Sequence, residues 1–218
     1  MTDSGMKLYT YFRSSAAWRV RIALVWKGLL HSAIPVHLLK DGGQQRAADY
    51  LAVNPQGLVP TLVDGDLTLS QSLAICEYLE EKYPQAPLLP SDLAERARAR
   101  AMALTIAADI HPLNNLRVLQ YLKGPLAQEQ SAVDAWIAHW IAAGFAAIEA
   151  QLEQMDSQQY CVAGQLSLAD LCLVPQVFNA RRFKVDMTPY PRIVSIDAHL
   201  MSLPAFADTQ PVRQSDAE

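Results

Sequence analysis

Two adjacent serines, Ser14 and Ser15, lie between an apolar segment and a run with helical periodicity. The first backbone N–H groups of a helix have no partner within it and carry about half a positive charge. An anion placed there is stabilised, and serine hydroxyls add donors that can point at it. The pair can therefore stabilise a thiolate, a phosphate or a carboxylate; the alternative is that both serines only cap the helix.

The residues on both sides of the serine pair predict a strand followed by a helix. Leu8–Phe12 is apolar and aromatic, which is typical of a buried strand. From Trp18 the period changes, and the apolar side chains fall on one helical stripe at Trp18, Ile22, Val25 and Trp26. The charged residues of this segment are expected off that stripe: Arg19, Arg21 and Lys27.

The first half of the chain predicts the element order β-α-β-α-β-β-α, which is the thioredoxin-like arrangement. A hairpin around Asp64-Gly65 is the strongest local signal in it. Pro60 precedes that turn and favours an edge or a strand start, with a cis bond as one possibility. Serines occupy positions 14 and 15, where the redox proteins of this fold would need cysteines, so disulfide exchange is not expected. The other elements expected here are a strand at 32–39 with Pro35 near an edge, a short helix at 44–51, strands at 58–63 and 66–69, and a helix from 70–72 to 83.

Three prolines, Pro84, Pro87 and Pro90, mark a linker, and after it every periodic segment is helical. A capping box at Ser167 and Asp170 marks one helix start. The sequence therefore predicts two domains, a thioredoxin-like one over 6–86 and an all-helical bundle over 91–212. The helices expected in the second domain are one from Ser91 or Asp92 that kinks near Pro112, one at 131–155, one through 177 and one at 189–203, with a loose tail after Pro211.

Composition narrows the function classes. The 218 residues carry a formal net charge of −4, which gives no electrostatic reason to expect nucleic acid. No run approaches the length of a membrane span, and no metal-ligand spacing is visible. The cysteines are expected to be buried free thiols in a reducing compartment, so a cytoplasmic protein is predicted: Cys76, Cys161 and Cys172.

The local sequence around the serine pair resembles a family signature. Residues 14–24, SSAAWRVRIAL, are similar to the S-S-C-x-W-R-V-R-I-A-L motif of the zeta-class glutathione transferases. Further similar segments are 54–62, 71–75, 169–177 and 182–191, so the resemblance covers nearly the whole chain. One departure is Ala16, which stands where the family pattern has cysteine.

The resemblance implies that glutathione is the cofactor and that Ser14 and Ser15 stabilise its thiolate, with Ser14 dominant. A free thiol has a pKa near about 8.5, and lowering it by about two units requires roughly 2.7 kcal/mol. A helix terminus supplies only about 0.3–1 kcal/mol. A hydroxyl donor to the anion, worth roughly 1.5–3 kcal/mol, supplies the rest.

The resemblance also implies a set of binding residues. Val59 would pair with the glutathione backbone as an added strand, and Ser72 with Gln71 would hold the γ-glutamyl carboxylate. A strand irregularity and plain helix capping are the alternatives at these two places. The other residues implied in cofactor binding are Ala16, Gln45, His111 and Asn115, among which Gln45 can equally be a surface residue and His111 a structural one.

Arginines are the candidates for an acidic substrate, because a guanidinium binds a carboxylate through two parallel hydrogen bonds. Arg13 adjoins the serine pair, and Arg117 and Arg182 are the other two candidates. A solvated basic face that includes Arg181 and Lys184 is the alternative for Arg182.

The function implied by the resemblance is the glutathione-dependent cis–trans isomerisation of maleylacetoacetate to fumarylacetoacetate in tyrosine catabolism, by reversible thiolate addition. Maleylpyruvate isomerisation uses the same chemistry, and the sequence does not separate the two. A transferase or dehalogenase acting on α-halo acids is the next alternative, and a non-enzymatic interaction module is the last. The family also implies a homodimer.

Overall fold

The computed structural model describes residues 5–218, and the chain divides into two compact units. The first unit contains the residues up to Leu88 together with Leu203–Glu218, and the second contains Leu89–Ser202. Residues 203–212, which the sequence assigned to the helical domain, therefore belong to the first unit. The reason is that the short helix α9 (Pro204–Ala207) buries Phe206 and contacts α1 (Ser15–Trp26).

The first unit is built on a sheet with strand order β2-β1-β3-β4. The strand β1 pairs in parallel with β2 and antiparallel with β3, and β3 pairs antiparallel with β4. This is the pairing of a thioredoxin-like domain, and Pro35 lies in the edge strand as predicted. The strands are β1 (Met6–Thr10), β2 (Ser32–Pro35), β3 (Thr61–Asp64) and β4 (Leu67–Ser70).

Two expected strands are shorter than the sequence indicated. The edge strand β2 ends at Pro35 instead of residue 39, and β3 begins only at Thr61 instead of residue 58. Pro60 has no N–H to give to a ladder, so regular pairing starts after it. The expected helix at 44–51 is replaced by 3₁₀ turns at Lys40–Gly42 and Gln44–Arg46, followed by α2 (Ala48–Val53).

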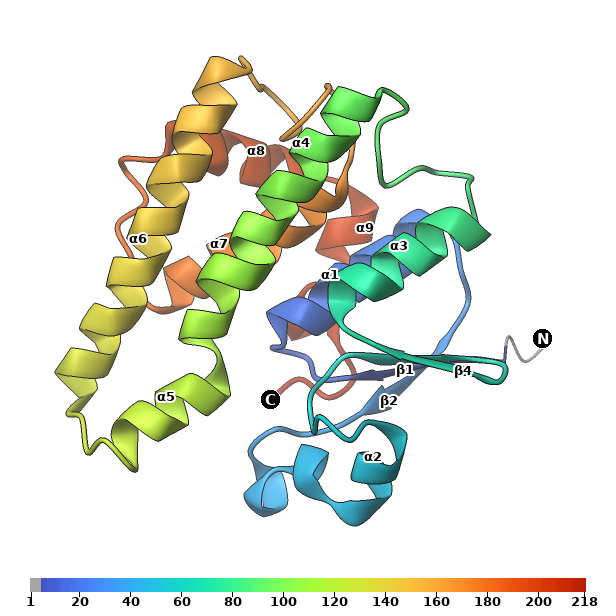
Figure 1. Ribbon diagram of the computed structural model, residues 1–218, viewed down its shortest axis with the longest axis vertical. Helices are drawn as coiled ribbons and strands as arrows, with labels where there is room; N and C mark the ends of the chain where they lie inside the picture. Colours follow the sequence, from blue (N-terminus) through green and yellow to red (C-terminus); the bar gives the residue numbers. More distant parts are fainter. Residues whose placement is uncertain (1–4) are drawn as a thin grey trace. The chain divides into compact units, whose positions relative to one another are not determined.

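Helices α1 and α3 (Ser72–Lys82) cover one face of the sheet, and α2 lies against the other (Figure 1). Every residue of α1 from Ala17 to Leu24 is buried. The expected amphipathic stripe is therefore wrong, since the side chains of Arg19 and Arg21 are inside the unit with 2% and 3% exposure. Lys27 is also enclosed and pairs with Glu80 at 2.9 Å.

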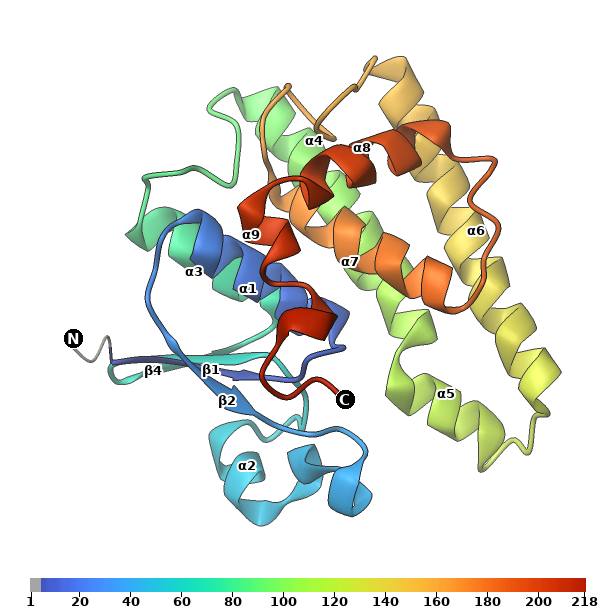
Figure 2. The same cartoon turned by 180° about the vertical axis from the view of Figure 1, so that it is seen from behind.

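The second unit is helical, as Figure 2 shows. The predicted kink is real: α4 passes into a π-helical segment at Thr105–Ile110 and a 3₁₀ turn at His111–Asn114, which contains Pro112. The capping box is also confirmed, because the buried carboxylate of Asp170 accepts from the Ser167 N–H at 2.7 Å. The helices are α4 (Leu93–Leu104), α5 (Leu116–Lys123), α6 (Gln130–Gln154), α7 (Leu168–Arg182) and α8 (Pro191–Met201).

The expectation that no segment approaches the length of a membrane span is wrong for α6. By length and composition alone this helix is long and apolar enough to cross a membrane. Its buried side chains recur every three or four residues, which is the spacing of a helix packed on one side in a bundle. They are Val133, Ile137, Ile141, Phe145, Ile148, Glu149 and Leu152.

The three cysteines are buried and form no disulfide with one another, as predicted: Cys76, Cys161 and Cys172. Burial raises the pKa of the Cys161 thiol, and the nearby carboxylate of Asp170 raises it further. A thiol whose anion is disfavoured in this way is a poor nucleophile. Cys161 is therefore a packing residue.

Gly144 in α6 allows a close approach inside the second unit. A Cβ built on Gly144 would lie 2.2 Å from Cδ1 and 2.3 Å from Cγ1 of Ile110. We expect Gly144→Ala to lower the free energy of unfolding by about 1–3 kcal/mol because of overpacking. Urea denaturation measures this change.

The matched control for this prediction is Gly144→Ala in a protein that lacks Cγ1 and Cδ1 of residue 110. In an Ile110→Ala background, Gly144→Ala should be neutral or stabilising by up to about 1 kcal/mol, since alanine favours helix over glycine. An equal loss in both backgrounds would show that the contact with Ile110 is not the cause.

Candidate active site

The turn between β1 and α1 presents the serine pair. Ser14 is the N-cap of α1, and its Oγ accepts a hydrogen bond from the Ala17 N–H at 3.1 Å. A hydroxyl can accept and donate at once, so the Ser14 hydrogen remains available for an anion. Capping and anion binding are therefore compatible. Ser15 is the first residue of α1 and is 7% exposed, and the first turn of α1 contains no acidic residue.

The backbone of this turn is held by the buried guanidinium of Arg21. Its Nη1 donates to Thr10 Oγ1 at 3.0 Å and to the Tyr11 carbonyl at 3.3 Å, and its Nη2 donates to the Phe12 carbonyl at 3.0 Å. Burial lowers the pKa of Arg21 to about 10, partly offset by the negative charge of Asp216. At neutral pH the side chain stays charged and fixes the chain just before the serines.

The C-terminal segment closes onto the same turn. The carboxylate of Asp216 accepts from the Phe12 N–H at 3.0 Å, and Thr209 Oγ1 accepts from Trp18 Nε1 at 2.9 Å. The Thr209 carbonyl accepts from Arg21 Nε at 3.2 Å. The expectation of a loose tail is therefore wrong, because residues 209–216 supply acceptors that the turn needs.

The start of α3 is a second helix N-terminus in the first unit. Gln71 precedes the helix with φ 71° and ψ 111°, a backbone conformation that L-residues rarely adopt, and its side chain donates to Gln56 Oε1 at 3.2 Å. Ser72 is buried, and its Oγ accepts from Arg19 Nη1 at 3.2 Å. The first turn of α3 also contains no acidic residue. Backbone strain of this kind is often found at binding sites.

The segment before β3 is fixed by side chains of α2 and the loop after it. The Val59–Pro60 peptide bond is cis. The Leu58 carbonyl accepts from the Tyr50 hydroxyl at 2.6 Å and from Asn54 Nδ2 at 2.8 Å. The residue before Val59 is thereby tied to the rest of the unit.

Gln45 lies in the second 3₁₀ turn and is 6% exposed. Its Nε2 donates to the Leu38 carbonyl at 3.4 Å, while its Oε1 is buried without a hydrogen-bond partner in the described structure. A surface role for Gln45 is excluded by this burial. An unpaired buried acceptor is costly unless a ligand donor completes it.

Arg13 is exposed beside the serine pair. Its guanidinium donates to the Tyr11 hydroxyl at 3.1 Å and lies 5.0 Å from the centre of the Phe12 ring. The two aromatic rings orient the side chain, and its remaining donors face solvent or a ligand.

Four candidates lie in the second unit: His111, Asn115, Arg117 and Arg182. Asn115 caps α5 through its Oδ1, which accepts from the Arg117 N–H at 3.2 Å, and its Nδ2 lies 3.4 Å from His111 Nε2. Arg117 and Arg182 are exposed, and the Arg182 guanidinium stacks 4.3 Å from the Phe183 ring centre. Capping and stacking thus position these side chains.

The alternative of a basic face around residue 182 is only partly supported. Arg181 forms an ion pair with the buried carboxylate of Asp197 at 2.6 Å, so its charge is already compensated. Arg182 and Lys184 are exposed.

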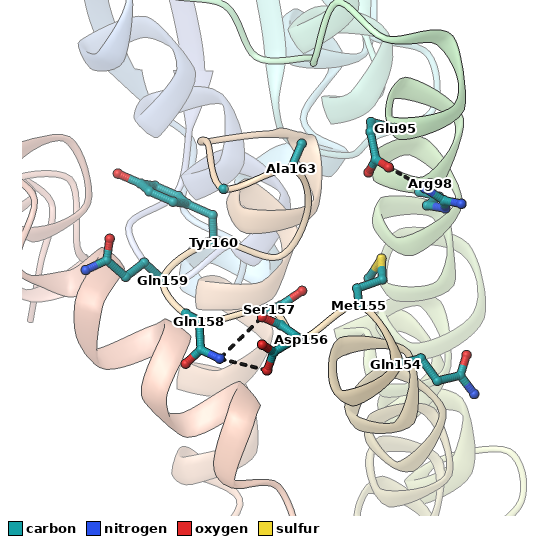
Figure 3. A pocket seen from close by; sticks show the side chains of 11 residues that line it. Glu95, Arg98, Gln154, Met155, Asp156, Ser157, Gln158, Gln159, Tyr160 and Ala163 are labelled. Atoms are coloured by element: carbon teal, nitrogen blue, oxygen red, sulfur yellow. Dashed lines mark hydrogen bonds and ion pairs between the residues drawn. The ribbon is translucent and has the colours of Figure 1, made fainter.

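A hollow of about 810 Å³ in the second unit is shown in Figure 3. Glu95 and Arg98 form an ion pair on one side, and Gln158 bonds to Asp156 on the other. None of the candidate residues lines this hollow. Among the described residues no group of three or more His, Cys, Asp and Glu side chains could hold a metal ion.

Sequence reasoning missed the buried arginines and the C-terminal acceptors. One signal for Arg19 and Arg21 was present: residues 16–24 are apolar all round the helix apart from these two, which predicts burial on every side. The contacts of Thr209 and Asp216 join residues about 200 apart in sequence, and no local pattern reports such pairs.

The chain is similar to known proteins over most of its length. Residues 8–87 match the family described as glutathione S-transferase, N-terminal domain. A probable maleylacetoacetate isomerase of Vibrio cholerae is 51% identical over 96% of this chain and 97% of its own.

Two solved structures are also similar. The holo structure of a bacterial zeta-class maleylpyruvate isomerase superposes with a TM-score of 0.93 at 45% identity, covering 97% of this chain and 100% of that one. A maleylacetoacetate isomerase of Methylobacterium extorquens with bound malonate and glutathione gives 0.93 at 38% identity, covering 97% and 99%.

The backbone of Gln71 generates a stability prediction. Gln71→Gly and Gln71→Ala both remove the side-chain amide, but only alanine keeps the Cβ that disfavours positive φ by about 1–2 kcal/mol. We expect the glycine variant to be more stable than the alanine variant by about 1 kcal/mol in urea denaturation. At Ala74, inside α3, the order should be reversed, with Ala74→Gly losing about 1 kcal/mol. Equal stability of the two Gln71 variants would contradict the strain.

Proposed function

Because the chain belongs to the zeta class of the glutathione transferase family, we propose that it converts maleylacetoacetate to fumarylacetoacetate, with glutathione as cofactor. The relatives named for this reaction are similar over nearly the whole chain. The structural observation that carries the proposal is the free donor of Ser14 at the N-terminus of α1, in a turn fixed by a buried guanidinium.

The first unit fits glutathione by the chemistry of its unpaired groups. Gln45 Oε1 is a buried acceptor without a donor, and two donors of the buried Arg19 have no acceptor in the described structure. A peptide with amide donors and carboxylate acceptors satisfies both kinds of group. When bound, glutathione supplies a thiol whose reversible addition to a cis double bond allows rotation about it.

The residues of this chain then have distinct roles. The Ser14 hydroxyl hydrogen donates to the sulfur anion, with the N-terminal N–H groups of α1 and Ser15 beside it. The backbone at Val59 pairs with that of the peptide, and Gln71 with Ser72 holds the γ-glutamyl carboxylate. The other residues that we assign to the cofactor are Ala16, Gln45, His111 and Asn115.

The substrate bears carboxylates, and we assign Arg13, Arg117 and Arg182 to them. All three guanidiniums are exposed, and stacking on aromatic rings orients Arg13 and Arg182. The Methylobacterium extorquens relative binds malonate, which is a dicarboxylate, together with glutathione. This supports an acidic substrate.

Maleylpyruvate is the second candidate substrate, because a similar zeta-class structure is a maleylpyruvate isomerase. Glutathione transfer to α-halo acids can proceed at the same site. We further propose that the protein acts in the cytoplasm as a homodimer. Its three buried cysteines form no disulfide, which suits a reducing compartment. Light scattering of the purified protein measures the oligomeric state.

The reaction is tested by absorbance-monitored turnover of maleylacetoacetate and of maleylpyruvate, each with and without glutathione. We expect turnover of maleylacetoacetate that depends on glutathione and leaves its concentration unchanged. A higher kcat/KM for maleylpyruvate would assign the second candidate. Consumption of glutathione without isomerisation would assign a transferase. If neither substrate is turned over, the isomerase proposal is wrong.

The role of Ser14 is tested by Ser14→Ala. Loss of a charge-assisted donor of roughly 1.5–3 kcal/mol should lower kcat/KM by about 10- to 150-fold. It should also raise the pKa of bound glutathione, measured by ultraviolet thiolate absorbance, so that activity moves to higher pH.

Asp92→Ala is the control for Ser14→Ala. Asp92 caps α4 through hydrogen bonds from the Ala94 and Glu95 N–H groups at 2.9 and 3.0 Å. This variant loses a helix cap of the same kind outside the serine turn, so its activity should be unchanged. Full activity of Ser14→Ala would contradict the assigned role.

A further inference from the structure

Arg19 carries a buried guanidinium that pairs with no acid among the described residues. Its side chain is 2% exposed, and its Nε and Nη2 are buried without hydrogen-bond partners in the described structure. Among residues 5–218 its one hydrogen bond runs from Nη1 to Ser72 Oγ at 3.2 Å, and no carboxylate pairs with it. A buried guanidinium with most of its donors unused is strongly disfavoured, unless an anion from outside completes it.

The surroundings of Arg19 add positive potential. It lies in the second turn of α1, and long side chains in a helix lean toward its N-terminus. Ser15, four residues earlier, shares its helix face. The contact with Ser72 brings the guanidinium to the start of α3, and neither α1 nor α3 has an acidic residue in its first turn. Two helix N-termini and one arginine therefore converge without a counter-charge.

The hydrogen bond to Arg19 fixes the direction in which Ser72 can donate. A guanidinium has no acceptor, so Ser72 Oγ is the acceptor in this pair and its hydrogen must point away from Arg19. The Ser72 hydroxyl does not cap the helix, since Gln71 is the N-cap of α3 and no side chain forms a capping hydrogen bond there. The Ser72 hydrogen is thus oriented for a ligand oxygen.

We propose that Arg19 is a positioning residue for the α-carboxylate of the γ-glutamyl group of glutathione, acting through Ser72. Arg19 turns the Ser72 hydroxyl hydrogen toward that carboxylate. The negative carboxylate in turn provides the counter-charge for the Arg19 guanidinium. The inference rests on the proposed use of glutathione and adds a residue to its binding site.

The test compares two ligands by isothermal titration calorimetry: reduced glutathione, and glutathione whose γ-glutamyl α-carboxylate is replaced by a primary amide. Arg19→Met should weaken glutathione binding by at least about tenfold, equal to about 1.4 kcal/mol. It should change binding of the amide by less than about twofold, because the amide has no charge to lose. Lys7→Met, which removes an exposed charge from the same unit, should leave both affinities unchanged.

Two further variants separate positioning from a structural effect. Arg19→Lys keeps the positive charge and should restore part of the glutathione affinity. If Arg19→Met does not fold, the same two titrations are made with Arg19→Lys instead. In a Ser72→Ala background, Arg19→Met should cost less affinity for glutathione than in the wild type, because the path through the hydroxyl is already broken.

The outcomes are distinguishable from those of the proposed function. If the wild-type protein binds neither ligand, the assignment of glutathione fails first. If the wild type binds glutathione but Arg19→Met weakens both ligands equally, or neither, the role of Arg19 is overturned. A larger glutathione KM with kcat unchanged at saturating glutathione would support positioning.

Discussion

The site depends on one interaction, the set of hydrogen bonds from Arg21 to the backbone before the serines. Carbonyl groups in a turn need donors, and the turn between β1 and α1 obtains them from a guanidinium instead of water. A guanidinium offers five donors in a fixed plane, so it can hold several carbonyls in one geometry. Ser14 is therefore presented at the helix start by a rigid backbone.

Around this turn the first unit places positive potential and removes negative charge. The N-termini of α1 and α3 lack acidic residues, and the acidic group that does approach, Asp216, is used by the Phe12 N–H. Stability alone would favour an acid in those first turns and a counter-ion beside Arg19. Their absence in the described residues, together with the strained backbone of Gln71, costs stability, and the anion binding that we propose gives this cost a function.

The sequence predicted features whose cause is local. The hairpin at Asp64-Gly65, the edge position of Pro35 and the capping box of Ser167 each depend on a few neighbouring residues, and each is present. The buried arginines were missed because charge was taken to mean exposure, although the rest of α1 is apolar on every side.

The placement of the C-terminal segment depends on tertiary contacts. Sequence periodicity does not encode it. Ser14, Ser15 and Arg13 were predicted from residue chemistry, and the other candidates of the first unit from the family motif. The donors and acceptors that orient them were not predicted. Arg19, Thr209 and Asp216 each act through one or two hydrogen bonds between segments that are distant in sequence.

Ala16 can be considered in the same physical terms. The donors at the start of α1 are backbone N–H groups and the Ser14 hydroxyl, and neither depends on the side chain at position 16. Alanine is also the residue that most favours a helix, so the first turn is not weakened. The cysteine of the family pattern would add a second sulfur beside the ligand thiol, in a place that lowers thiol pKa. With alanine there, the reactive sulfur of the turn is that of the cofactor, and the chain gives up a thiol that electrophiles could modify.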